Sequence, residues 1–399
     1  MGGGHSPEEP GPGPLPPRIS AYLYPWDVLG DPELVVRLGS AGIGHVVVAA
    51  AYHSVLAATP QHPLHRFVVA ETAALYRPVR PEIWAGRRLR PYGAPWSGCE
   101  DSFERAVEQL TADGLGVSAW VVLTHNSALG RRHRDLTVRN CFGDSYEWAL
   151  CPANEEVRNY AGLLAAEAVR ELPLEGVSLE ACGQLGAVHA SHHDKTANAY
   201  SPIANKILSV CCCEACGRAW SLKGLERPDV TGALRQAFRT AMEDSSAATS
   251  PEDLLGEPLA TELLATRQRH RDGLTEQVLN ELTDSASLRT TLHAQANPWA
   301  TGASPGLTTT TPAQLDCVLT PLEPTSPRCA DTIGALRALL PEGVAAAGYV
   351  NHLGAEPAGF EAHADRLANA GADELHLYHF GLANKAQLEL FSRLASLST

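Results

Sequence analysis

The sequence has few positive charges and no long hydrophobic segment. Its 399 residues include 31 Lys and Arg against 45 Asp and Glu, which gives a formal net charge of -14 at pH 7. Nucleic acids and anionic membrane surfaces attract basic patches, so this balance argues against both as partners. No segment approaches the roughly 18–20 apolar residues that a membrane-spanning helix requires.

The N-terminus lacks the features of a secretion signal. Residues 1–17 are rich in Pro and Gly and have neither a basic start nor an apolar core, so we expect a disordered tail there. We therefore expect a cytoplasmic protein. In a reducing compartment its ten cysteines are expected to be free thiols or metal ligands rather than disulfides.

Short apolar segments alternate with helical patterns along the rest of the chain. The segments that we expect to be strands are 18–25, 45–53, 117–124, the segment ending at residue 180, 287–295, 315–320, 344–350 and 374–380. Such strands, joined by helical crossovers, indicate a parallel sheet, and this number indicates a closed (β/α)8 TIM barrel of the α/β class. A doubly wound open sheet is the alternative, but no Gly-x-Gly-x-x-Gly turn follows the first strand. We predict one barrel domain, residues 18–399, with a helical insertion at about 217–284.

Side chains at the carboxyl ends of barrel strands converge on one cleft. The expected ends supply aromatic, amide, imidazole and carboxylate groups. This mixture suits a small-molecule carbohydrate or glycoside, because aromatic faces cover its C–H surfaces and polar groups bind its hydroxyls. Each histidine could instead be a structural imidazole. The residues that we expect to bind substrate are Tyr24, Trp26, Asp27, His53, His125, Asn126, His192, His193, His293, Gln295, Asn351, His352, Tyr378 and His379.

Glu180, at the end of an apolar strand, is the candidate catalytic acid of a glycoside hydrolase. Glycoside hydrolysis normally needs two carboxyl groups, one protonated to assist the leaving group and one ionised. We expect a partly apolar cleft and a neighbouring carboxylate to raise the pKa of Glu180. Glu323, just after the sixth strand, is the first choice for the second carboxyl group, and Asp194 and Asp27 are the next choices.

Other functions on the same barrel stay open. A metal-dependent hydrolase or lyase could hold a catalytic ion with strand-end histidines, although no His-x-His follows the first strand. The histidines concerned are His53, His125, His293, His352 and His379. A carbohydrate-binding protein that has lost its nucleophile is a further alternative. We expect no organic cofactor, and a homo-oligomer is an open alternative for the assembly.

Cys211, Cys213 and Cys216 form a Cys-x-Cys-x-x-Cys cluster that could supply three ligands of a tetrahedral zinc ion. A closed structural site needs a fourth ligand. Cys151, at the start of the helix before the Glu180 strand, is the first choice, and the substitutes are Cys141, Cys182 and Cys212. All-thiolate ligation would indicate structural zinc. The alternative is a set of small buried thiols without metal.

The order of these features over roughly residues 150–216 resembles the family 42 β-galactosidases. The similar features are the segment from Cys151 to Tyr160, an apolar strand ending in Glu180, and then the Cys-x-Cys-x-x-Cys cluster. The resemblance implies that Glu180 is the general acid/base. It also implies that Cys151, Cys211, Cys213 and Cys216 hold zinc.

The chain departs from that family in three respects. Leu179 stands where the family has Asn before its acid/base, and the segment between Glu180 and the thiol cluster is longer and rich in His. The seventh strand ends in Asn351-His352, where the family has its nucleophilic Glu. We therefore interpret the chain as a glycosidase-like barrel outside family 42.

Overall fold

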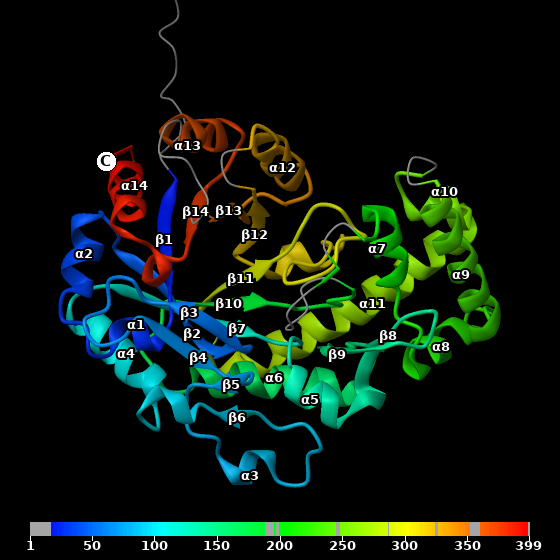
Figure 1. The fold of residues 1–399 in the computed structure, drawn as a ribbon, viewed down its shortest axis with the longest axis horizontal. Helices are drawn as coiled ribbons and strands as arrows, with labels where there is room; N and C mark the ends of the chain where they lie inside the picture. Colours follow the sequence, from blue (N-terminus) through cyan, green and yellow to red (C-terminus); the bar gives the residue numbers. More distant parts are fainter. Residues whose placement is uncertain are drawn as a thin grey trace, which may run out of the picture.

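The computed structural model describes residues 17–187, 195–196, 199–244, 248–285, 287–323, 326–351 and 360–397. Its centre is a closed barrel of eight parallel strands, in which β1 pairs with both β14 and β2 (Figure 1). Going around the barrel, the strands are β1 (Arg18–Leu23), β2 (His45–Tyr52), β7 (Gly116–Val122), β10 (Gly176–Glu180), β11 (Arg289–His293), β12 (Cys317–Leu322), β13 (Ala345–Asn351) and β14 (Glu374–Tyr378). All eight predicted strands and the predicted barrel are therefore confirmed.

Helices surround the barrel (Figure 1). They are α1 (Pro25–Val28), α2 (Leu34–Ser40), α3 (Pro81–Trp84), α4 (Ser102–Ala112), α5 (Ser127–Arg132), α6 (Glu155–Val169), α7 (Pro202–Leu208), α8 (Glu214–Ser221), α9 (Arg227–Glu243), α10 (Pro251–Leu255), α11 (Glu257–Glu281), α12 (Arg328–Arg337), α13 (Phe360–Asn369) and α14 (Lys385–Leu397). The predicted insertion, 217–284, holds most of α8 together with α9, α10 and α11. None of the helices in the described ranges is long and apolar enough to cross a bilayer.

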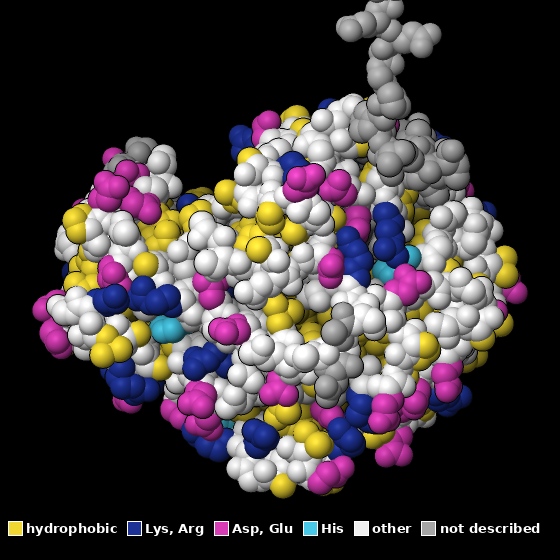
Figure 2. All heavy atoms as spheres, turned by 180° about the vertical axis from the view of Figure 1, so that it is seen from behind, with side chains coloured by type: hydrophobic (Ala, Val, Ile, Leu, Met, Phe, Trp, Pro, Cys, Tyr) yellow, Lys and Arg dark blue, Asp and Glu magenta, His cyan; other side chains and the backbone are white. Residues whose placement is uncertain are grey.

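Among the described residues, six short strands lie in the loops between the barrel strands and helices. They are β3 (Val55–Ala58), β4 (Phe67–Ala70), β5 (Ala74–Leu75), β6 (Tyr92–Gly93), β8 (Thr137–Arg139) and β9 (Ser145–Leu150). Acidic and basic side chains are interspersed over the face shown in Figure 2.

Local sequence explains the elements that form the barrel wall. Every residue of β2 is buried, as expected for a strand packed on both faces of a parallel sheet. Helix α4 begins at an N-cap, because the Asp101 side chain accepts a hydrogen bond from the backbone N–H of Glu104. Its buried Phe103, Ala106, Val107 and Leu110 recur at helical spacing and form the face that packs on the barrel.

The interior of the barrel is polar at its centre. The Tyr22 hydroxyl, the Ser178 hydroxyl and Nε2 of His293 lie within 2.9–3.2 Å of one another. Branched apolar side chains usually fill this position in such barrels. The polar groups here connect strands on opposite parts of the ring, and each has hydrogen-bond partners among the other two.

Candidate active site

A cavity of about 440 Å³ opens at the carboxyl ends of the strands. Parallel strands place their last residues at the same end of the barrel, so side chains far apart in sequence meet there. The lining residues are Tyr52, Glu180, His293, Gln295, Thr301, Gly302, Ala303, Ser304, Pro321, Tyr349, Asn351 and Tyr378. Of the residues predicted to act in catalysis or to bind substrate, this lining brings together Glu180, His293, Gln295, Asn351 and Tyr378.

Glu180 is the ionisable centre of this cavity. Its side chain is buried, and burial raises its pKa to about 7, partly opposed by a hydrogen bond from Trp120. The Trp120 indole Nε1–H donates to Oε2 of Glu180 at 2.8 Å. Near neutral pH a substantial fraction of Glu180 is therefore protonated, as a general acid requires. The raised pKa agrees with the prediction: of the two predicted causes, burial raises it, and no second carboxylate among the described residues contributes.

His293 lies beside the same carboxyl group, with its Nδ1 3.8 Å from Oε2 of Glu180. Burial lowers the pKa of His293 to about 3, so the ring is neutral. Its Nε2 lies 2.9 Å from the Ser178 hydroxyl. When that hydroxyl donates to Nε2, the ring proton is on Nδ1 and faces Glu180.

Tyrosines form much of the cavity wall. Tyr349 and Tyr378 stand on adjacent strands with ring centroids 5.0 Å apart, and Tyr52 faces the cavity from β2. Burial raises the pKa of each of these hydroxyls, so all are protonated donors at neutral pH. The substrate list drawn from the sequence omitted Tyr349. Strand alternation could have found it, because it lies two residues before Asn351 and so on the same face.

Several residues that were predicted to bind substrate pack behind this wall instead. Tyr24 stacks on Trp26 and on His379, with centroids 4.4 Å and 4.3 Å apart, and all three are buried outside the cavity lining. His53 and His125 stack on each other at 4.3 Å, also outside that lining. These rings support the wall from behind.

Asn126 and Asp27 have local structural contacts. The Asn126 side chain caps α5 by accepting from the backbone N–H of Leu129 at 3.0 Å. Asp27 accepts from the backbone N–H of Tyr24 at 2.8 Å, and burial raises the pKa of Asp27 to about 7. Neither side chain lines the cavity.

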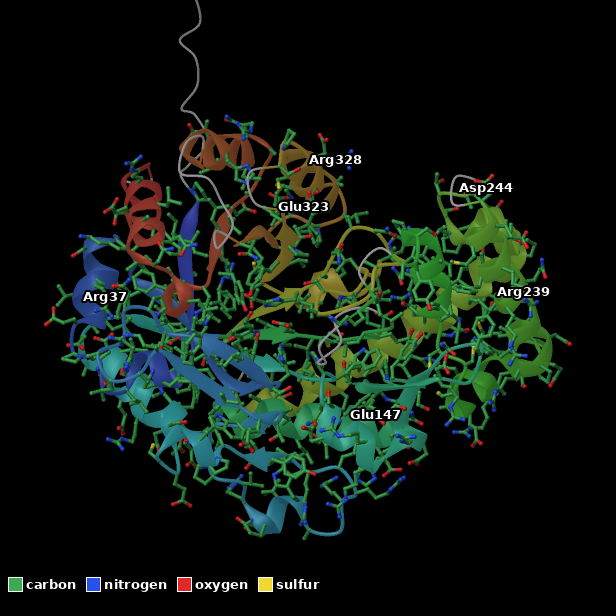
Figure 3. All side chains as sticks on the ribbon, viewed as in Figure 1. Arg37, Glu147, Arg239, Asp244, Glu323 and Arg328 are labelled. Carbon is green, nitrogen blue, oxygen red and sulfur yellow. The ribbon has the colours of Figure 1, made fainter. Side chains whose placement is uncertain are left out.

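The structure does not bring the first choice of second carboxyl group to Glu180. The side chain of Glu323 is exposed just past β12, and it lies near Arg328 and α12 rather than in the cavity lining (Figure 3). The segment turns there, because the Glu323 carbonyl accepts hydrogen bonds from Ser326 and Cys329. Asp194, His192, His193 and His352 lie outside the described residues. Within those residues, Glu180 is the only carboxyl group that lines the cavity.

A cluster of four cysteines lies beside the barrel. The Sγ atoms of Cys151, Cys211, Cys213 and Cys216 all lie within 4.8 Å of one another, and all four residues are buried. Cys151 Sγ is 3.7 Å from that of Cys213 and 3.8 Å from that of Cys216. A tetrahedral site with Zn–S bonds of about 2.3 Å has S···S edges of about 3.8 Å, so the cluster fits a zinc ion.

The cysteines that were alternatives to Cys151 as the fourth ligand lie apart from this group. Cys212 directs its Sγ to the carbonyl of Val210 at 3.6 Å, and Cys182 contacts the Thr275 hydroxyl at 3.3 Å. Cys141 is buried but is not in the four-thiol cluster. The cluster could therefore hold a metal ion through the four residues chosen first from the sequence.

Helix α11 contacts both the thiol cluster and the rim of the cavity. Nδ1 of His270 lies 4.0 Å from Sγ of Cys216. Arg267 donates to the carbonyls of Trp299 and Ala300, just before the lining segment 301–304. Thr275 contacts Cys182, two residues after Glu180.

No known family model matches the chain, and no curated protein matches it. Solved structures with a similar fold include α-L-fucosidase isoenzyme 2 from Paenibacillus thiaminolyticus, with a TM-score of 0.57, 12% identity, and coverage of 96% of this chain and 49% of that chain. They also include the PgaB (BpsB) glycoside hydrolase domain from Bordetella bronchiseptica, with a TM-score of 0.54, 13% identity, and coverage of 96% and 100%.

A third similar structure is the β-galactosidase from the psychrophilic Marinomonas ef1, with a TM-score of 0.55, 10% identity, and coverage of 95% of this chain and 59% of that chain. This chain therefore spans about half the length of the fucosidase chain. At these identities the likeness shows the barrel fold alone, and the resemblance to family 42 stays a prediction.

Proposed function

We propose that this protein is a glycoside hydrolase in which Glu180 is the general acid. One observation carries the proposal: a buried carboxyl group with a pKa of about 7 ends a barrel strand and lines a cavity walled by tyrosines. A carboxyl group that is partly protonated near neutral pH can donate its proton to the glycosidic oxygen as the bond breaks. Likeness to barrels that are glycoside hydrolases supports the same activity.

The other lining residues suit a sugar. The rings of Tyr52, Tyr349 and Tyr378 offer apolar faces to its C–H surfaces, and their hydroxyls donate hydrogen bonds. Asn351 would bind sugar hydroxyls from the end of β13. Gln295 is held in place by its Nε2–H, which donates to the carbonyl of Ser304 at 2.8 Å.

The second carboxyl group stays a prediction. Asp194 follows β10 in the chain, and it is the remaining choice because Glu323 lies outside the cavity and Asp27 is buried behind its wall. The metal-dependent alternative has less support. Among the described residues, the groups that could hold a metal contain none of His53, His125, His293 and His379.

We further propose that the four-thiol cluster holds a structural zinc ion. Four thiolates close the coordination shell, so the ion would stabilise the fold beside the barrel without taking part in hydrolysis. None of the described cysteines is in a disulfide, which supports a reducing, cytoplasmic location.

A panel of aryl and alkyl glycosides tests the hydrolase proposal. We expect turnover of at least one aryl glycoside, and we expect Glu180→Gln to lower it by about 10²–10⁴-fold for leaving groups that need protonation. The loss should be much smaller for dinitrophenyl glycosides, whose leaving groups depart without a proton. The exposed Glu342→Gln is the matched control and should keep wild-type rates.

Two results would overturn the proposal. One is the absence of hydrolysis across the panel. The other is a Glu180→Gln variant whose loss does not depend on the leaving group.

A further inference from the structure

A second cavity, of about 210 Å³, opens at the opposite end of the barrel from Glu180. Arg18, His45, Arg289 and Glu374 line it, and each is the first residue of its strand. In barrel enzymes the chemistry sits at the carboxyl ends of strands, so the proposed glycosidase reaction gives no reason for a polar cavity here.

Three buried side chains with different donor atoms meet at this end. They are Cys317 of β12 and Glu374 and His376 of β14, and one ligand atom of each lies within 4.8 Å of the others. Oε2 of Glu374 is 3.0 Å from Nε2 of His376 and 4.0 Å from Sγ of Cys317. The other two donors therefore converge on one oxygen of the Glu374 carboxylate.

Strand β13 lies between the two contributing strands, and its sequence explains the close approach. Ala345 pairs with Cys317, and Ala347 pairs with Glu374. Tyr349 lines the Glu180 cavity, so the alternation of strand side chains places Ala345 and Ala347 on the inner face as well. Two methyl groups leave space in which the thiol and the carboxyl group can meet across the strand.

We propose that Cys317, Glu374 and His376 bind a divalent transition-metal ion, and the donor set favours zinc. Thiolate, imidazole and carboxylate are the three ligand types that zinc takes from proteins. Small movements would suffice, because neighbouring ligand atoms around a tetrahedral zinc ion are about 3–4 Å apart. The site uses no residue of the four-thiol cluster.

The site would be open rather than closed. Three protein ligands leave one position of a tetrahedral ion vacant, and both Glu374 and His376 face the 210 Å³ cavity. A water molecule or a small anion could therefore occupy the fourth position from the cavity side. This differs from the four-thiol cluster, where the protein would fill every position.

The surroundings of the carboxylate suit this role. Nη2 of Arg289 contacts Oε1 of Glu374 at 2.7 Å, which orients the group and leaves Oε2 toward the other two donors. Ligating carboxylates are commonly held by such outer partners. A thiolate and a carboxylate together neutralise a divalent ion, so its charge would not be left uncompensated beside Arg289.

The other nitrogen of the His376 ring, Nδ1, is buried and has no hydrogen-bond partner within the part of the chain that the structure describes. Buried polar atoms normally have a partner. The ring therefore has bonding capacity that its neighbours do not use.

Counting metal ions per chain tests the proposal directly. The full chain, produced with zinc and purified with a reductant, is analysed by elemental mass spectrometry. We expect Cys317→Ser and His376→Gln each to bind one zinc ion fewer than the wild type. Cys329→Ser is the matched control, because Cys329 is a buried thiol on α12 outside both metal groups, and it should keep the wild-type count.

Cobalt substitution gives a readout that separates ligand loss from misfolding. The difference spectrum between wild type and Cys317→Ser should contain a thiolate-to-cobalt charge-transfer band. The difference between wild type and His376→Gln should contain the ligand-field bands of one cobalt ion. Circular dichroism and gel filtration establish that each variant is folded, and Glu374→Gln replaces any variant that is not.

Equal metal counts in the wild type and in folded Cys317→Ser and His376→Gln would overturn the proposal. The comparison is a difference between variants, so it holds whatever the four-thiol cluster binds. It also requires no glycoside, so it is independent of the hydrolase proposal.

Discussion

The Trp120 indole on β7 donates a 2.8 Å hydrogen bond to Oε2 of Glu180 on the adjacent strand β10. This bond favours the ionised carboxylate, whereas burial favours the carboxylic acid, and burial has the larger effect. The balance leaves the pKa of Glu180 at about 7. The sequence had predicted a neighbouring carboxylate that raises this pKa further, whereas the neighbour found here is an indole N–H that lowers it.

Replacing Trp120 by Phe should raise the pKa of Glu180 further. The ring is kept but its donor is lost, and a hydrogen bond worth about 1 kcal/mol corresponds to roughly 0.7 pKa unit. If Glu180 is the general acid, the basic limb of the kcat/KM profile moves to higher pH. Titration of the glutamate side-chain carbons by ¹³C NMR gives the same pKa without a substrate.

Trp148→Phe is the control for that experiment, because the Trp148 indole donates to the carbonyl of Gly186 rather than to Glu180. It should leave the Glu180 titration where it is. An unmoved titration in Trp120→Phe, or equal shifts in both variants, would contradict the role assigned to the indole.

Replacing Glu180 by Gln should stabilise the folded protein at high pH. The folded pKa of about 7 lies above the unfolded value of about 4.3, so the folded state holds the proton more tightly between these values. The stability that this group contributes is therefore fully present below the unfolded pKa and is lost as the pH rises through the folded pKa. The free energy of unfolding of the variant, relative to that of wild type, should be about 2 kcal/mol higher at pH 8 than at pH 5.

Urea unfolding of both proteins at the two pH values measures this difference. The exposed Glu342→Gln serves as the control and should show a constant offset from wild type. If the free energy of unfolding depended on pH in the same way in wild type and Glu180→Gln, the carboxyl group would titrate normally in the folded state.

Cys211→Ser and Cys212→Ser should behave differently although the two residues are adjacent. Cys211 belongs to the four-thiol cluster, whereas Cys212 turns toward the carbonyl of Val210. We expect Cys211→Ser to lose one zinc ion and to lower Tm by at least about 5 °C, because binding of a structural metal contributes to folding. Cys212→Ser should keep its zinc. Equal metal content in the two variants would show that the cluster is not a zinc site.

Strand positions could be predicted well because each strand carries its own signal. The fully buried β2 is a continuous apolar segment, and the sixth strand, expected at 315–320, appears at Cys317–Leu322. The carboxyl ends of the strands were expected to share one cleft, and Glu180, His293 and Tyr378 do line one cavity, while their roles stay predictions. Each of these residues is the last of its strand, where alternation still fixes the direction of the side chain.

Some residues beyond the last strand position lie elsewhere than predicted, although Gln295, two residues past β11, does line the cavity. Glu323 comes one residue after β12, where a turn directs it to the surface, and Asp27 comes after β1 on a short helix that holds it behind the wall. The choice of Cys151 over Cys141, Cys182 and Cys212 was open in the sequence, because no spacing rule covers ligands from separate elements. The group of Cys317, Glu374 and His376 could not be predicted from the sequence, because Cys317 lies on another strand, 57 residues before Glu374.

Helix α11 contacts three different parts of the molecule within about two turns. Its His270 lies beside the thiol cluster, Arg267 holds the segment before the cavity rim, and Thr275 contacts Cys182 just past Glu180. A helix of this length is stiff, so a movement of one of these positions along the helix axis carries the other two with it. A closed thiol cluster beside His270 would therefore restrain the same helix whose Arg267 holds the Trp299 and Ala300 carbonyls before the cavity rim.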